Sequence, residues 1–192
     1  MGKFLIEKCQ DIEGLYAITP KVFGDERGYF LETYHFEEFK EEGLDMVFVQ
    51  DNQSMSKKGV LRGLHFQKSF PQGKLVRVIS GEVYDVAVDL RKDSKTFGKW
   101  HGIVLSGEKK NMFYVPEGFA HGFLVMSETA EFTYKCTNYY HPEDEGGIAW
   151  DDETLAITWP IMENMEVVLS EKDKKHPTLV EWMESEGISR RD

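Results

Sequence analysis

Two histidines stand beside glycines at the edges of apolar segments, where a strand could present each of them to a pocket. His65 lies in residues 62–67 (RGLHFQ), and His121 lies in residues 115–123 (VPEGFAHGF). Histidine exchanges a proton near neutral pH and is also the commonest metal ligand. A lone histidine in a β-rich chain is usually structural, so a functional interpretation depends on the residues around it.

Motifs of several common enzyme classes are missing. The sequence has no Gly-x-Gly-x-x-Gly, no Gly-x-x-x-x-Gly-Lys-Ser/Thr, no Gly-x-Ser-x-Gly and no His-Glu-x-x-His. These patterns serve dinucleotide binding, phosphate binding, serine hydrolysis and zinc-dependent hydrolysis. We therefore do not expect those chemistries.

The elements that position the histidines are expected to be strands. Aromatic residues make up 13% of the chain, and short apolar stretches are separated by Gly, Asp or Asn, which is typical of β structure. One predicted strand has two aspartates on one face and apolar residues on the other: Asp85 and Asp89 against Tyr84, Val86, Val88 and Leu90. Turn signals occur at residues 80–82, 106–108, 116–118 and 145–147. The pattern predicts an all-β chain with an antiparallel double sheet.

Helical spacing is confined to residues 36–42 and 178–186, and both segments are expected at the periphery. In the second segment, Leu179, Trp182 and Met183 recur at intervals of three and four residues. No fixed repeat or linker divides the chain. We expect one domain over residues 1–192, with a β core at about 14–170 and a C-terminal segment, 171–192, that contains the second helix.

The charge balance limits the partners. The chain has 34 acidic and 23 basic residues and a formal net charge of -11, so nucleic acid is not expected to bind. Neither a membrane-spanning stretch nor the apolar run of a signal peptide is present, which favours no membrane contact and a cytoplasmic location. Cys9 and Cys136 match no metal-binding spacing, so we expect structural thiols.

The segment around His121 resembles the second motif of the cupin superfamily, in which a Pro-x-Gly turn brings a histidine to the mouth of a jelly-roll barrel. Metal-binding cupins combine this histidine with a His-x-His pair and a glutamate. Here residues 65–67 read HFQ, so Gln67 stands where the second imidazole is needed. Zinc and iron take three or four suitable ligands, and no metal site is expected.

Eight motifs in order resemble the dTDP-4-dehydrorhamnose 3,5-epimerase family, from about Gly14 to about Leu179. They are FGDERGYF at 23–30, QDNQS at 50–54, LRGLHFQ at 61–67, QGKLVRV at 72–78, PEGFAH at 116–121, YKCTNYY at 134–140, GIAW at 147–150 and LSEKD at 169–173. The resemblance implies a cupin-type jelly-roll β-sandwich that works as a homodimer. It also implies conversion of dTDP-4-dehydro-6-deoxy-D-glucose to dTDP-4-dehydro-L-rhamnose.

The implied reaction inverts C5 and C3 of the sugar. Because the C4 ketone acidifies both hydrogens, it needs a base, a group that stabilises the enolate and an acid on the opposite face, and no cofactor. By resemblance, His65 is the base, Asp173 orients its imidazole, Lys74 stabilises the enolate and Tyr134 returns the proton. Taken alone, Asp173 would be interpreted as a solvated acid among lysines.

The resemblance also implies a set of substrate-binding residues. Arg27, Arg62 and Lys172 would surround the pyrophosphate, where local positive charge must outweigh the net charge of the chain. Phe23 and Tyr140 would lie near the thymine, with Tyr140 stacked on it. The remaining contacts would come from Glu32, Gln50, Asp51, Asn52, His121 and Glu145.

Three other functions stay open from the residues. A mono-epimerase or ketoisomerase could act on the same sugar nucleotide, because related folds serve neighbouring reactions. A non-catalytic cupin could bind a sugar or nucleotide in an intact pocket. A metal-dependent cupin oxygenase would carry a bound transition metal, which Gln67 disfavours.

Overall fold

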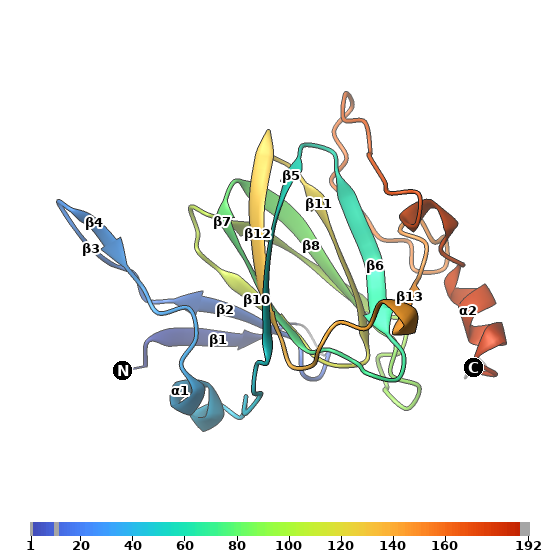
Figure 1. The fold of residues 1–192 in the computed structure, drawn as a ribbon, viewed down its shortest axis with the longest axis horizontal. Helices are drawn as coiled ribbons and strands as arrows, with labels where there is room; N and C mark the ends of the chain where they lie inside the picture. The colour runs from blue at the N-terminus through green and yellow to red at the C-terminus, as the bar shows by residue number, and fades with distance from the viewer. Residues whose placement is uncertain (1, 10–11, 189–192) are drawn as a thin grey trace.

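The computed structural model describes residues 2–9 and 12–188, and two antiparallel sheets packed face to face form most of it (Figure 1). The six-stranded sheet contains, in spatial order, β1 (Phe4–Lys8), β2 (Tyr16–Pro20), β10 (Met112–Val115), β7 (Lys74–Ser80), β12 (Thr129–Cys136) and β5 (Gln50–Lys57). The five-stranded sheet contains β13 (Glu145–Gly147), β6 (Leu61–Gln67), β11 (Phe119–Val125), β8 (Glu82–Asp89) and β9 (Trp100–Ser106). The all-β sandwich predicted from the sequence is confirmed.

Strand β8 shows how the alternating pattern builds the sandwich. Val83 and Ala87 belong to the core between the two sheets, whereas Val86 and Val88 belong to a second apolar cluster on the outer face of the five-stranded sheet. Asp85 therefore points into the sandwich, where it is completely buried. The predicted placement of Asp85 on the face opposite Val86 and Val88 is confirmed, although Val83 and Ala87 share the face of Asp85.

Two short helices cover the outer faces of the sheets. Helix α1 (Phe36–Glu41) packs Phe39 against the six-stranded sheet. Helix α2 (Leu179–Ser185) packs Leu179, Trp182 and Met183 against the five-stranded sheet, and a capping box between Thr178 and Glu181 starts it. Both helices lie within one residue of the predicted bounds.

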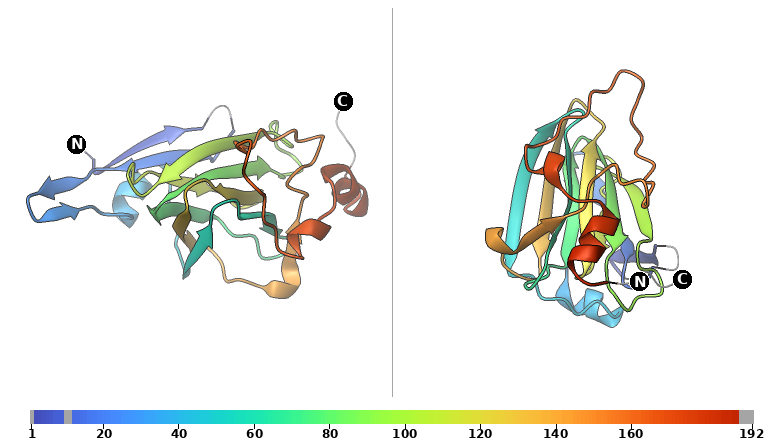
Figure 2. Two further views of the ribbon diagram at one scale, coloured as in Figure 1. Left: turned by 90° about the horizontal axis from the view of Figure 1, so that it is seen from above. Right: turned by 90° about the vertical axis from the view of Figure 1, so that its right-hand side faces the viewer.

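A two-stranded hairpin projects from the sandwich, at the end of the molecule opposite α2 (Figures 1 and 2). It consists of β3 (Phe23–Asp25) and β4 (Gly28–Phe30), and every residue in these strands is exposed. Tyr29 and Phe30 are 60% and 63% exposed. Exposed aromatic side chains gathered on one arm are typical of an interaction surface.

The turn predicted at residues 145–147 is wrong, because these residues form β13. This strand follows a short 3-10 helix, η1 (Pro142–Asp144), and pairs with β6, so that Gly147 lies opposite His65. A second 3-10 helix, η2 (Asp173–Lys175), precedes α2. The glycines serve close packing here: a Cβ at position 147 would overlap the ring of His176.

Among the described residues, no helix is long and apolar enough to cross a membrane.

Asp152 fastens the C-terminal segment to the sandwich, and its removal tests this contact. Its buried carboxylate accepts hydrogen bonds from the backbone N–H groups of Leu155 and Leu179, both at 2.7 Å. Asp152→Ala leaves two buried donors unpaired, so we expect a loss of about 2–4 kcal/mol in the free energy of unfolding, measured with urea. Glu153→Ala, at the exposed neighbour, is the control, and equal losses in both variants would contradict the assignment.

Candidate active site

A cavity of about 240 Å³ opens between the two sheets. Its wall includes residues from β5, β6, β7, β11 and β12, together with the segment that leads into β13. The structure brings together here a large part of the predicted site: Arg62, His65, Lys74, His121, Tyr134, Tyr140 and Glu145. The wall also contains Ser54, Gln67, Gln72 and Phe132, to which the sequence analysis assigned no role at a site.

A bulge between β6 and β11 turns two of these residues into the cavity. The register shifts between His121 and Phe123 on β11, opposite Arg62 and His65 on β6. Arg62 and His65 are three residues apart, so without the bulge they would face opposite sides of the sheet. Gly63 permits the bulge because it has a φ of 123° and a Cβ there would lie 2.6 Å from the Cα of Gly122.

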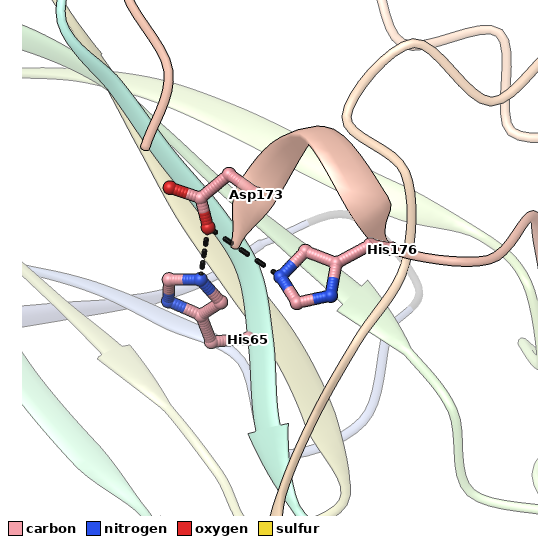
Figure 3. Close-up of side chains that lie close together, drawn as sticks. All are labelled: His65, Asp173 and His176. Atoms are coloured by element: carbon pink, nitrogen blue, oxygen red, sulfur yellow. Dashed lines mark hydrogen bonds and ion pairs between the residues drawn. The ribbon is translucent and has the colours of Figure 1, made fainter. Parts of the chain in front are cut away.

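His65 is held from behind by Asp173, a residue of η2 (Figure 3). Its Nε2 lies 2.5 Å from Oδ1 of Asp173, and the hydroxyl of Ser170 donates to Oδ2 at 2.7 Å. Burial alone raises the pKa of Asp173, but the hydrogen bonds from His65 and Ser170 prevail and lower it to about 2. The ionised carboxylate keeps the proton of His65 on Nε2, which leaves Nδ1 free to accept another.

A second histidine, which the sequence analysis did not identify, completes this cluster (Figure 3). Nε2 of His176 lies 3.4 Å from the same Oδ1 of Asp173, and its side chain is 8% exposed. Burial lowers the pKa of His176, and the nearby His65 lowers it further. No sequence signal pointed to His176, whereas the spacing of Ser170 and Asp173 could have suggested a local side-chain hydrogen bond.

Glu145 faces His65 from the other side. Its Oε1 lies 3.9 Å from Nδ1 of His65, while its Oε2 accepts from the hydroxyl of Tyr140 and pairs with Nζ of Lys172, both at 2.5 Å. Burial raises the pKa of Glu145, but the hydrogen bonds from Lys172 and Tyr140 outweigh this and lower it. Lys172, although it is not in the cavity wall, is thus linked to it.

Lys74 and Tyr134 lie on the facing sheet. The Nζ of Lys74 is 6.0 Å from the centre of the Tyr134 ring, and among the described residues no hydrogen bond or ion pair satisfies it. Burial lowers the pKa of Lys74, and nearby anionic groups oppose this shift. Burial also raises the pKa of Tyr134, so its hydroxyl keeps its proton. The amino group of Lys74 and the protonated phenol of Tyr134 therefore stand across the cavity from His65.

His121 forms a second buried histidine and aspartate pair at the cavity. Its Nε2 lies 2.8 Å from Oδ1 of Asp85, on the neighbouring strand β8. Burial raises the pKa of Asp85, and His121 partly offsets this. The sequence analysis placed Asp85 on a strand face without assigning it a partner.

Gln67 fastens the loops at the cavity mouth. Its amide nitrogen donates to the carbonyls of Phe70 and Tyr139 at 2.6 and 3.1 Å, and its oxygen accepts from the N–H of His141 at 2.7 Å. The position that holds an imidazole in metal-binding cupins therefore has a structural task in this chain.

The other predicted binding residues lie at the rim or away from the cavity. At the rim, the side-chain amide of Gln50 donates a hydrogen bond to Oδ1 of Asn52 at 3.0 Å. Its Oε1 accepts a hydrogen bond from the N–H of Tyr140 at 2.9 Å. Asp51 points to the opposite face of β5 and pairs with Lys135 at 2.7 Å. The structure does not bring three further residues to the cavity of their own chain: Glu32, which pairs with Lys3, and Phe23 and Arg27, which belong to the β3–β4 hairpin.

Comparison with known proteins gives one consistent family. The family profile described as dTDP-4-dehydrorhamnose 3,5-epimerase matches residues 9–181. The chain is 55% identical to a dTDP-4-dehydrorhamnose 3,5-epimerase from Methanothermobacter thermautotrophicus, over 94% of this chain and 97% of the relative. It is 56% identical to the enzyme of that name from Salmonella typhimurium, over 88% of this chain and 92% of the relative.

A solved structure agrees in shape as well. The dTDP-6-deoxy-D-glucose-3,5-epimerase from Legionella pneumophila, in complex with dTDP-4-keto-L-rhamnose, superposes with a TM-score of 0.90 at 50% identity, covering 98% of this chain and 99% of the other. This likeness confirms the cupin-type jelly-roll predicted from the resemblance.

The depressed pKa of Asp173 predicts how stability depends on pH. Because the folded value is about 2 and the ordinary value is 3.8, the carboxylate stabilises the fold above pH 3.8, and its contribution disappears as the pH falls towards about 2. We expect the difference in unfolding free energy between the unmodified chain and Asp173→Asn to shrink by about 2 kcal/mol between about pH 5 and about pH 2. For Glu171→Gln, an exposed control, the difference should change little, and a constant difference for Asp173→Asn would contradict the assignment.

Proposed function

Because the chain belongs to the dTDP-4-dehydrorhamnose 3,5-epimerase family, we propose that it converts dTDP-4-dehydro-6-deoxy-D-glucose to dTDP-4-dehydro-L-rhamnose by inversion at C5 and C3. One observation carries this proposal beyond family membership. The candidate base, His65, and the candidate acid, Tyr134, stand on opposite sheets of one cavity, with Lys74 beside Tyr134. A sugar ring held between the sheets would lose a proton on one face and gain one on the other, which inverts the carbon.

Each proposed role follows from a contact. Nδ1 of His65 accepts the proton from C5 or C3, and Asp173 stabilises the imidazolium that forms, through its 2.5 Å contact with Nε2. Lys74, whose Nζ lies 6.0 Å from the centre of the Tyr134 ring and lines the same cavity, stabilises the enolate oxygen at C4. Tyr134 delivers the proton to the opposite face, and no step requires a redox cofactor.

Nucleotide binding is proposed for the cations and aromatic groups at the mouth. Arg62 lines the cavity and is held by the hydroxyl of Ser56 at 3.0 Å, so its planar guanidinium is oriented for phosphate oxygens. Lys172 contributes a second positive charge, although the chain as a whole carries -11. Tyr140 would stack on the thymine, and Gln50, Asn52, His121 and Glu145 would supply polar contacts.

The hairpin residues support a homodimer. Phe23 and Arg27, predicted to bind the nucleotide, lie on the projecting β3–β4 arm. This arm and α2 are at opposite ends of the molecule (Figure 1). An exposed aromatic arm and an incomplete binding site in the same chain are both explained if the arm reaches the cavity of a second copy. We place this dimer in the cytoplasm, as the sequence predicts.

Proton exchange measured by NMR in deuterium oxide tests the reaction. We expect the unmodified chain to put two deuteriums into the sugar and to invert both carbons. His65→Ala should slow exchange by about 100-fold to 10,000-fold, because it removes the base. Tyr134→Phe should keep exchange but lose inversion, and inversion at the unmodified rate would contradict the role of Tyr134.

The same spectra separate the alternatives. One exchanged and inverted carbon identifies a mono-epimerase, and saturable binding without exchange identifies a binding module.

Mixed dimers test the arm. Arg27→Ala should raise KM, and His65→Ala should be inactive. If the arm serves the partner, co-expression of the two variants rebuilds an intact site in the mixed dimer, and about a quarter of all sites recover the unmodified KM. If the arm serves its own chain, every site keeps one defect, and no recovery would refute the exchanged arm.

A further inference from the structure

We propose that His65, Asp173 and His176 form a binding site for a divalent transition-metal ion such as Zn²⁺, and that an ion bound there stops His65 from acting as a base. The first half stands on the geometry of these side chains alone. The second half rests on the proposed function, because it concerns the nitrogen assigned to proton transfer.

The three side chains supply a suitable set of donors. Each offers one ligand atom, and the three atoms lie within 4.8 Å of one another. Oδ1 of Asp173 is 2.5 Å from Nε2 of His65 and 3.4 Å from Nε2 of His176. Ligands at about 2.0–2.2 Å from a tetrahedral zinc ion are about 3.3 Å apart, so the contact between His65 and Asp173 has to widen, whereas the contact between His176 and Asp173 already has a suitable length. Two imidazoles and a carboxylate leave a coordination position open for water.

The state of His176 points independently to a ligand. Its Nε2 is buried and faces Asp173 (Figure 3), and among the described residues it makes an ion pair with Oδ1 at 3.4 Å but no hydrogen bond of good geometry. A buried nitrogen whose hydrogen bonding is incomplete is rare in folded chains and calls for an explanation. Its ring is fixed in this position by packing on Gly147, where even a Cβ would overlap it. The sequence analysis counted only ligands on the barrel strands, and His176 comes instead from the segment that crosses the outer face.

A bound ion would reverse the tautomer of His65. In the present arrangement, Nε2 carries the proton and points to Asp173, so Nδ1 is free. A metal ion needs the lone pair of Nε2, so the proton moves to Nδ1, which faces the anionic Oε1 of Glu145 at 3.9 Å. The imidazole stays neutral and no proton is lost overall, but Nδ1 can no longer accept one. Inhibition would therefore not require the ion to occupy the sugar pocket.

Metal titration of the purified, metal-free chain tests the site. We expect Zn²⁺ to bind with a stoichiometry of one per chain in calorimetry, and Co²⁺ to give the visible absorption of a tetrahedral nitrogen and oxygen site. His176→Gln should weaken Zn²⁺ binding by on the order of 100-fold or more. His101→Gln is the matched control, because His101 on β9 has a buried ring nitrogen that makes no hydrogen bond within the described part of the chain, and it should bind Zn²⁺ like the unmodified chain. Mg²⁺, which prefers oxygen ligands, should not compete.

Each outcome bears on one half of the proposal. Equal Zn²⁺ affinity in His176→Gln and the unmodified chain would overturn the site. Full occupancy without loss of deuterium exchange would overturn the tautomer switch, whereas exchange that falls with occupancy and returns with a chelator supports it. If His176→Gln does not fold, imidazole nitrogen NMR of the unmodified chain decides, because Zn²⁺ must shift Nε2 of both histidines. If the metal-free chain shows no exchange, the proposed function fails, and the Co²⁺ spectrum still tests the site.

Discussion

The contact between Asp173 and His65 joins the C-terminal segment to the five-stranded sheet across 108 positions of sequence. The carboxylate is buried, ionised and held by Ser170, and its Oδ1 faces Nε2 of His65 and, at a longer distance, Nε2 of His176. That burial in turn needs the covering layer in which Asp152 binds the start of α2 and aromatic side chains pack on the sheet. The segment that covers the outer face of the five-stranded sheet thus also supplies the carboxylate beside His65.

The two sheets of the sandwich carry different ionisable groups of the cavity. His65, Glu145 and Asp173 lie on or behind one sheet, and Lys74 and Tyr134 lie on the other. Burial shifts the pKa values of the two groups on the six-stranded sheet in opposite directions: it lowers the pKa of Lys74 and raises that of Tyr134. Burial therefore keeps the phenol of Tyr134 protonated and weakens the hold of Lys74 on its proton, because it favours the neutral form of both groups.

Sequence patterns predicted the regular parts of this fold and missed its exceptions. The alternation along residues 84–90 and the spacing around Trp182 identified a strand and a helix, because period and burial agree there. The bulge at Gly63 was not predictable, since a period of two would place Arg62 and His65 on opposite faces. Resemblance, not spacing, pointed to Asp173, and His176 carried no signal because two of its neighbours, His65 and Gly147, come from distant strands.

Since Asp173 follows every strand of the sandwich in the sequence, the order of synthesis has a consequence. On the ribosome, both sheets and the whole cavity wall are made before the residue that orients His65. A nascent or clipped chain that ends within residues 150–170 would already contain the wall of the pocket, yet its imidazole would lack the carboxylate. Such a chain would also lack Lys172, which pairs with Glu145, and the apolar side chains of α2, so the last segment supplies both charged groups beside the pocket and part of the cover of the five-stranded sheet.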